Sequence, residues 1–482
     1  MKSIWSESYD IKDRGVLNNS KEVEVLIIGG GIVGLLTAYM LKEKGVEAIV
    51  IDRGKVLKGN TINTTAKITI QHNIIYDKLI KEFGEENAKK YADANKLALE
   101  NYEEIIKKNN IDCEFEKEDA YVYSLDDPKK IIKEYEAAMK LGIDAELVDK
   151  TELPFEVAKA VKFKNQANYN PVKFLNFIAK DLTIYENTKA IEVKENTVIT
   201  DKGEIKAKHI VVATHFPIIN VPGFYFLRMH QEREYVIALK NAQILNGMYI
   251  DEKDGGYSFR RYKDYLILGG AGGRTGDNEA GGSYDKLRNF AKKHFENSVE
   301  EYHWSAQDCI TSDGIPFIGY YSKEMPNVYV ATGFNKWGMT SSMVSAIIIS
   351  GLITGKEYDF NEIFSPNRFD FTASIKNLAV DGLETTYNFI AEKIRIPLST
   401  IENVNNGEAD VIIHEGKKVG IYKSENGEVH TVSNKCPHLG CELKWNNDDL
   451  SWDCPCHGSR FDYKGSLLDS PSIKELKYEE EW

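Results

Sequence analysis

The stretch Val23-Glu24-Val25-Leu26-Ile27-Ile28-Gly29-Gly30-Gly31-Ile32-Val33-Gly34 decides the fold of the N-terminal part of this 482-residue chain. Its first six residues form an apolar, β-rich run, and the glycines that follow fit the order G-x-G-x-x-G. An apolar helical stretch continues to about Glu43, and a second strand, residues 48–51, ends at Asp52. This order of strand, glycine turn, helix, strand and acidic residue predicts a dinucleotide-binding βαβ unit.

The residues of this unit have separate expected tasks. Gly29 permits the tight turn, Gly31 lets the backbone approach the pyrophosphate, and Gly34 allows close packing of the helix. The helix N-terminus then faces the phosphates, and Asp52 takes the ribose hydroxyls. The alternative is a membrane span, because residues 25–41 are almost wholly apolar or Gly. That run is shorter than the roughly 20 residues that a bilayer helix needs, so a span is not expected.

A second pattern lies near the C-terminus, in Cys436-Pro437-His438-Leu439-Gly440-Cys441 and Cys454-Pro455-Cys456-His457-Gly458-Ser459. A Cys-x-His pair and a Cys-x-x-His pair on two facing loops supply two thiolates and two imidazoles, which is the ligand set of a Rieske [2Fe–2S] cluster. A structural zinc site also uses two Cys and two His. That alternative leaves the second cysteine of each loop and the glycine turns unexplained.

Both loops resemble a Rieske domain of the cytochrome bc type. The resemblance implies a disulfide between the two remaining cysteines and a bond from the Ser459 hydroxyl to a cluster sulfide. Phe461 stands where the resembling domains have a Tyr that bonds a ligand cysteine. Because hydrogen bonds to sulfur raise the potential, we expect a potential below that of quinol-oxidising relatives, inside the range of roughly −150 to +300 mV. The implied ligands are Cys436, His438, Cys454 and His457, and the implied disulfide is Cys441–Cys456.

Later blocks decide between NAD and FAD. Residues 208–215 form a strand that runs into a turn, and residues 313–319 and 328–333 precede Gly338-Met339-Thr340 and an apolar helix. These blocks, in this order, resemble the D-amino-acid-oxidase-like flavoproteins, the group of glycine and sarcosine oxidases. The resemblance implies FAD. It also implies that the last helix points its positive N-terminus at the flavin pyrimidine edge, where it stabilises the anionic reduced flavin.

Three further segments look like the FAD-dependent oxidoreductases that carry a fused C-terminal Rieske domain. They are residues 64–67, 71–72 and 304–308. In those proteins the segment from Thr65 to Lys67 sits beside the flavin, so Lys67 is expected to contact the pyrophosphate or the flavin. The expected FAD-binding residues are Gly29, Gly31, Gly34, Asp52, Arg53, Thr65, Ala66, Lys67, Ala213, Thr214, Gly333, Gly338, Met339 and Thr340.

The expected fold class is an α/β Rossmann-like FAD-binding domain with an inserted antiparallel-sheet substrate domain, plus a C-terminal all-β Rieske domain. Residues 1–365 form the oxidoreductase domain, with FAD-binding parts near 20–75, 150–218 and 305–360 and substrate or helical parts near 76–149 and 219–304. Helical spacing predicts helices over 76–109 and 127–141. Alternating residues within 219–275 predict an antiparallel sheet. A helical linker, 366–402, and the Rieske domain, 403–482, follow.

Composition narrows the possible partners and the compartment. The net charge of −13 and the absence of basic clusters argue against nucleic acid. The N-terminus has no apolar signal region, which predicts a cytoplasmic protein. Cytosolic thiol pools disfavour disulfides, so the oxidation state of the Cys441–Cys456 pair stays open. Cys113 and Cys309 are expected to be packed thiols.

These parts predict a flavin-dependent oxidoreductase that takes a hydride from a small amine or amino acid. Electrons then pass singly through the cluster and leave by its exposed histidine edge to a soluble acceptor protein, since flavin holds one or two electrons and the cluster one. A second nucleotide fold for NADH is not found, because residues 269–276 have Thr275 at the third glycine position.

No general base is evident, and the substrate residues are the least defined part of the sequence. Two alternatives remain open, a reductase or electron-transfer component of a multi-protein redox system, and a redox sensor. An arginine could clamp a substrate carboxylate bidentately. The substrate-site candidates are His72, Arg260 and Tyr257, with Arg228, Arg233, Arg261 and Tyr235 beside them.

Overall fold

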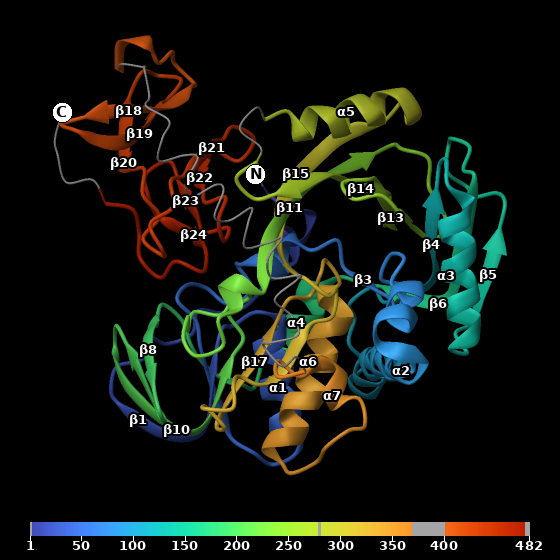
Figure 1. Ribbon diagram of the computed structural model, residues 1–482, viewed down its shortest axis with the longest axis horizontal. Coiled ribbons are helices and arrows are strands. Elements are labelled where there is room, and N and C mark those ends of the chain that lie inside the picture. Colours follow the sequence, from blue (N-terminus) through green and yellow to red (C-terminus); the bar gives the residue numbers. More distant parts are fainter. Residues whose placement is uncertain (1, 278–280, 369–400, 478–482) are drawn as a thin grey trace.

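The computed structural model describes residues 2–277, 281–368 and 401–477 (Figure 1). One sheet has eight strands, a second has nine, and two small sheets belong to the C-terminal domain. The C-terminal domain, orange and red in Figure 1, lies beside β11 and β15 of the nine-stranded sheet. The expected linker of residues 366–402 falls largely on residues 369–400, which lie outside the described residues.

The eight-stranded sheet is the expected dinucleotide-binding core. Its main path runs β16-β17-β10-β1-β2-β7, and β1 pairs in parallel with both β2 and β10. Val25, Leu26 and Ile27 of the central strand are fully buried, as expected where helices cover both faces of a parallel sheet. The strands are β1 (Lys21–Ile28), β2 (Ala48–Ile51), β7 (Thr183–Tyr185), β8 (Ala190–Lys194), β9 (Thr197–Thr200), β10 (Gly203–Val212), β16 (Phe317–Tyr320) and β17 (Val328–Thr332).

Helix α1 (Ile32–Glu43) begins directly after the glycine turn and packs against α4 (Pro171–Ala179) and α6 (Gly338–Ile353). Gly29 has a φ of 116°, and a Cβ on Gly34 would lie 2.0 Å from the Gly29 carbonyl oxygen. Both positions therefore require glycine. The apolar run divides into β1 and α1, and among the described residues no helix is long and apolar enough to cross a membrane.

The nine-stranded sheet confirms the expected antiparallel insertion, although β12 pairs with β4 in parallel. The glycine-rich run 269–276 lies mostly in β14, the position of a sheet strand and not of a second nucleotide fold. The strands, in chain order, are β3 (Lys67–Ile68), β4 (Glu116–Ser124), β5 (Ala145–Val148), β6 (Lys159–Asn168), β11 (Met229–Lys240), β12 (Met248–Asp251), β13 (Ser258–Tyr262), β14 (Tyr265–Arg274) and β15 (Val299–Thr311).

Two helices confirm the helical spacing of the sequence, α2 (Tyr76–Asn109) and α3 (Pro128–Lys140). Gly84 interrupts α2 with φ 80° and ψ 163°. The buried Glu134 carboxylate of α3 accepts backbone N–H bonds from residues 75, 76 and 77, so it satisfies donors at the start of α2. The remaining elements are α5 (Ser283–His294), α7 (Asn361–Phe364), η1 (Ile4–Ser8), η2 (Asn60–Asn63), η3 (Tyr225–Leu227) and η4 (Ile401–Asn403).

The C-terminal domain consists of two small antiparallel sheets, which confirms the expected all-β class. Trp452 and Phe461 are fully buried and pair across neighbouring strands of the four-stranded sheet. The three-stranded sheet is β18 (Ala409–His414), β19 (Lys417–Lys423) and β20 (Val429–Ser433), and the other is β21 (Lys444–Asn446), β22 (Ser451–Asp453), β23 (Arg460–Asp462) and β24 (Leu467–Asp469).

Candidate flavin and iron–sulfur sites

A cavity of about 1140 Å³ lies where the eight-stranded and nine-stranded sheets meet. The glycine turn, the N-terminus of α1 and the end of β2 line one part of it, and strands β11 and β15 line another. Of the expected FAD-binding residues, those that line the cavity are Gly29, Gly31, Asp52, Arg53, Thr65, Lys67, Ala213, Thr214, Gly338 and Met339.

Four expected FAD-binding residues do not line this cavity. Gly34 packs on the Gly29 carbonyl, and a Cβ on Gly333 would lie 2.3 Å from the Thr311 methyl carbon. The Ala66 carbonyl accepts a bond of 2.8 Å from Arg260, and Thr340 donates to the Thr69 carbonyl. These four residues therefore support the cavity wall through packing and hydrogen bonds and do not face the cavity.

The cavity residues fit a dinucleotide. Asp52 directly follows β2. One of its carboxylate oxygens accepts a bond of 2.7 Å from the Gly30 N–H and the other a bond of 2.8 Å from the Gly54 N–H, and these bonds fix the orientation of the carboxylate. Burial raises the pKa of Asp52. The N-terminus of α6 also opens into the cavity at Gly338 and Met339, where the first N–H groups of a helix lack intrahelical partners.

Lys67 and His72 lie in the cavity wall beside the start of α6. Burial, together with the nearby Arg260 guanidinium, lowers the pKa of Lys67 to about 7. The Tyr91 hydroxyl donates to His72 Nδ1 at 2.7 Å, and His72 Nε2 donates to the Thr69 carbonyl at 2.8 Å. Burial lowers the pKa of His72 to about 3, so the imidazole is neutral.

A row of charged side chains that the sequence reasoning missed lies on the other wall. His230, Glu232 and Glu234 alternate along β11, and Asp308 faces Glu232 from β15. Lys336 pairs with both glutamates and lies 2.8 Å from Glu232. Burial and the two glutamates outweigh Lys336 and raise the pKa of Asp308 to about 7. Asp308 therefore changes its charge near neutral pH.

The expected arginine clamps have other partners. Arg260 is fully buried and donates to the carbonyls of Thr65, at 2.6 Å, and Ala66, so it supports the flavin loop from outside the cavity. Arg261 pairs with Glu116, and Arg228 donates to the Pro366 carbonyl. None of these arginines lines the cavity, which argues against their direct contact with a substrate.

Two expected tyrosines and the remaining arginine also point elsewhere. The Tyr257 ring lies 4.0 Å from the Phe290 ring, outside the cavity lining. Tyr235 accepts a bond of 3.1 Å from Asn446 of the C-terminal domain, and Arg233 pairs with Asp449 there at 2.6 Å. These two β11 residues contact the C-terminal domain.

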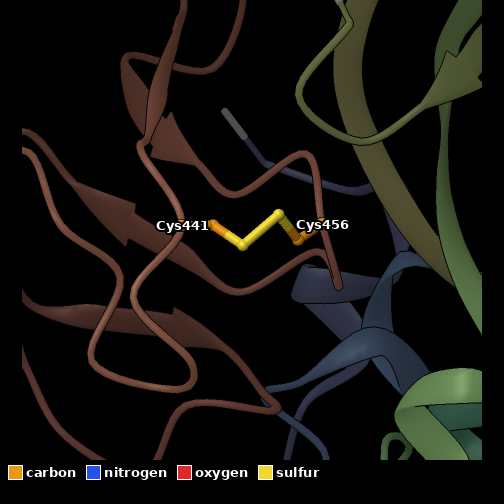
Figure 2. The surroundings of a disulfide bond; sticks show 2 residues. All are labelled: Cys441 and Cys456. Carbon is orange, nitrogen blue, oxygen red and sulfur yellow. A yellow bond between two sulfur atoms is a disulfide. The ribbon is translucent and has the colours of Figure 1, made fainter. Parts of the chain in front are cut away.

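The two Cys/His loops of the C-terminal domain face one another as expected. Cys441 and Cys456 form a disulfide with a Cα–Cα distance of 6.5 Å, and Figure 2 shows it joining the loops. Cys436 and Cys454 are buried free thiols. The Cys454 thiol and the backbone N–H of His438 lower the pKa of Cys436 against the effect of burial, while the bond to Cys436 and burial raise the pKa of Cys454.

The two loop imidazoles fit metal ligation. His438 Nδ1 and His457 Nδ1 are buried, and neither finds a hydrogen-bond partner among the described residues. Burial lowers the pKa of His438 to about 4 and that of His457 to about 3, which keeps both rings neutral, as ligands must be. The Ser459 hydroxyl lowers the pKa of Cys436 as well and accepts a 2.9 Å bond from the Ser472 N–H. An iron pair bound by two thiolates and two imidazoles fits this arrangement.

The expectation of an exposed histidine edge is wrong for His457, which is only 4 % exposed. The Phe226 ring lies 5.6 Å from the His457 ring and 6.1 Å from the His438 ring. Asn220 Oδ1 lies 2.8 Å from His438 Nε2. The histidine side of the loops therefore rests on the oxidoreductase domain, because polar and aromatic residues of segment 220–226 cover it.

Comparison with known proteins agrees with both sites. The FAD dependent oxidoreductase family (DAO) matches residues 24–352, and the Rieske [2Fe-2S] domain family matches residues 395–479. The chain belongs to the DAO family of FAD dependent oxidoreductases and carries a C-terminal Rieske domain. It binds FAD and a [2Fe–2S] cluster accordingly.

A curated relative matches the chain over nearly the whole length of both proteins. The chain is 36% identical over 492 residues to the "Putative Rieske 2Fe-2S iron-sulfur protein YhfW" of Bacillus subtilis (strain 168), covering 98% of this chain and 97% of the relative. L-proline dehydrogenase from P. horikoshii has a similar fold, with a TM-score of 0.60, 20% identity and coverage of 73% of this chain and 98% of that chain. Glycine oxidase from Geobacillus kaustophilus gives a TM-score of 0.60, 15% identity and coverage of 72% and 99%.

Proposed function

We propose that the protein oxidises a small amine or amino acid by hydride transfer to FAD and passes the electrons singly through the cluster to an external acceptor. One observation supports this above all: residues of strand β11 line the flavin cavity on one face and bind the cluster domain on the other. FAD supplies a two-electron acceptor and the cluster a one-electron relay. The two proposed carriers would therefore lie on opposite faces of one strand.

The proposed cofactor contacts follow from placement in the structure. Asp52 would bind the ribose and the α1 N-terminus the pyrophosphate, while Gly338 and Met339 would present the α6 N-terminus to the flavin. The proposed cluster ligands are Cys436, His438, Cys454 and His457, with Ser459 as a hydrogen-bond donor to the cluster. Lys67, in the cavity wall near Thr65, would contact the flavin.

Asp308 is the proposed proton acceptor for the substrate ammonium group. An amine gives up a hydride only when its nitrogen holds a free electron pair, so the ammonium proton must leave first. A carboxyl with a pKa of about 7 takes such a proton at neutral pH, and Asp308 has this property. Glu232 and Glu234 are held by Lys336 and give the same wall a negative field that favours a cationic amine.

The names of proteins with a similar fold support oxidation at a carbon–nitrogen bond. The names of two of them, glycine oxidase and L-proline dehydrogenase, describe enzymes that act on amino acids. Oxidation at a carbon–nitrogen bond is therefore the proposed chemistry for this chain. A soluble electron acceptor protein in the cytoplasm is the proposed partner.

The test is anaerobic stopped-flow mixing of the holoprotein with a panel of amines and amino acids. We expect one class to bleach the flavin, followed by bleaching of the cluster, and we expect Asp308→Asn to slow the first phase. Asp254→Asn, which changes another carboxylate of the cavity lining, is the matched control. If no amine bleaches the flavin but a reduced ferredoxin does, the amine-oxidising function is wrong, and the electron-transfer alternative takes its place.

A further inference from the structure

Strand β11 lies between one wall of the flavin cavity and the cluster loops, and residues 468–470, 472 and 473 of the C-terminal domain also line the cavity directly. His230, Glu232 and Glu234 line the cavity. Gln231 and Arg233, between them in sequence, bind the C-terminal domain. This division follows from the strand itself, because successive side chains of a β-strand point to opposite faces. The neighbouring strand β15 divides in a similar way, since Asp308 lines the cavity and Ser305 donates to Asp449.

Two buried glutamines on these strands bind the cluster loop directly. Gln231 Nε2 donates to the His457 carbonyl at 2.7 Å and to the Ser470 carbonyl at 2.9 Å. Gln307 Nε2 donates to the Gly458 carbonyl and to Gln231 Oε1, each at 2.7 Å. Both N–H donors of each amide are therefore used, and the network fixes the orientation of both side chains.

The cluster loop lies very close to β11 and to the segment after β14, at one glycine in each contact. A Cβ added to Gly458 would lie 2.6 Å from Gln231 Cβ, and one added to Gly276 would lie 2.7 Å from Pro455 Cα. Glycine at both positions removes the side chain that would hold the two surfaces apart. The ligand His457 is consequently held by its own carbonyl against β11.

Gln307 also contacts residues that line the flavin cavity. Its backbone carbonyl accepts a bond from Asn60 Nδ2, and the Asn60 amide also lies 3.0 Å from His215 Nε2. Asn60, His215 and Gln307 all line the cavity. Gln307 thus contacts Asn60 of η2 through its backbone and the cluster loop through its side chain.

We propose that Gln231 and Gln307 are positioning residues for electron transfer between the two cofactors. They hold the His457–Gly458 backbone against the cavity wall and so fix the separation that the electron crosses. When both groups are bound, the reduced flavin would supply two electrons one at a time to a cluster that accepts one. An external one-electron acceptor would reoxidise the cluster between the two transfers, and the protons released from the flavin would pass to solvent.

This inference rests on the proposed electron route but not on the proposed substrate, so its test uses none. A light pulse with a deazaflavin sensitiser reduces the flavin of the anaerobic holoprotein, and absorbance follows the electron to the cluster. The variants are Gln231→Leu and Gln307→Leu. Gln243→Leu is the matched control because Gln243 is exposed and its side chain donates to the Glu152 carbonyl. Cluster content, flavin content and the EPR spectrum of the reduced cluster are measured on each protein.

We expect both leucine variants to keep their cofactors and their EPR spectrum while the transfer rate falls about tenfold or more. A displacement of about 1 Å can change the rate of a positioned reaction by up to about 100-fold. If a leucine variant loses its cluster, glutamate at the same position replaces it, as Gln231→Glu or Gln307→Glu, since that change keeps the side-chain shape and removes the donor. Transfer at the parent rate in the cofactor-loaded variants overturns the inference.

The outcomes separate the inference from the proposed function. If the variants slow the transfer and no amine bleaches the flavin of the parent, the positioning role stands and the amine substrate falls. If an amine bleaches the flavin and the leucine variants transfer at the parent rate, the positioning role falls and the substrate stands. If no electron reaches the cluster from the photoreduced flavin, the positioning role and the electron route fall together.

Discussion

Replacing Arg233 with Met should release the Rieske domain from the oxidoreductase domain. Arg233 and Arg460 face Asp449, Asp453 and Asp469, at distances of 2.6 to 3.8 Å. Two arginines against three aspartates give a formal charge of −1, which becomes −2 in the variant. Burial alone would raise the pKa of Asp449, but the two arginines outweigh it and lower the pKa.

The cost follows from burial. The side chains of Arg233 and Asp449 are 6 % and 1 % exposed, and removing one partner of a buried pair costs about 3–5 kcal/mol. Asp449 keeps its 2.8 Å contact with Arg460, so we expect the lower end, about 3 kcal/mol. By mass action this makes the undocked form about 100-fold more populated.

Amide hydrogen exchange of the holoprotein, read on peptides that contain residues 446–453, measures this opening. We expect exchange there to become about 100-fold faster in Arg233→Met, while peptides from residues 409–423 exchange as before. Arg261→Met is the matched control, because Arg261 pairs at the surface with Glu116, and such a pair contributes only about 0–1 kcal/mol. Exchange no faster in Arg233→Met than in Arg261→Met would refute the reasoning.

Three further outcomes are expected. Phe461→Tyr should raise the cluster midpoint in a redox titration by about 40 mV, the equivalent of one hydrogen bond of about 1 kcal/mol, and an unchanged midpoint contradicts this. Changing both Cys441 and Cys456 to Ala removes a bridge across a sequence separation of 15, which should cost about 3 kcal/mol and speed cluster loss in urea. Asp308→Asn should be more stable than the parent at pH 8 but not at pH 4, by thermal unfolding. The raised pKa of about 7 means that ionising Asp308 penalises the folded state as pH rises from about 4 to 7, by up to about 4 kcal/mol, and equal melting shifts at both pH values would count against it.

Local patterns in the sequence predicted the elements that local forces determine. The glycine turn before α1, the helices α2 and α3 and the spacing within the two Cys/His loops follow from neighbours in sequence. The pairing of Cys441 with Cys456 was implied by the resemblance to Rieske domains. The relation between the domains was not predicted, because it depends on residues far apart in the chain. Gln231 and His457, for example, are 226 residues apart and share one hydrogen bond.

The roles of the charged residues in the inserted sheet also could not be predicted from neighbours in sequence. Arginines within the inserted sheet looked like carboxylate clamps, but Arg260 and Arg233 are used to hold a loop and a domain. The run His230-Gln231-Glu232-Arg233-Glu234 offered a signal that could have been read, since five polar residues within a strand predict polar surroundings on both of its faces. Which face meets which cofactor requires the fold.

The alternation along β11 has a consequence for how this protein can change. Inserting or deleting one residue ahead of Gln231 would exchange the two faces of the strand, because side chains repeat with a period of two. Gln231 and Arg233 would then face the cavity, and Glu232 and Glu234 would face the cluster loop. Damage at this point would disable two cofactor sites at once, so single-residue length changes in β11 should be far less tolerated than substitutions on either face.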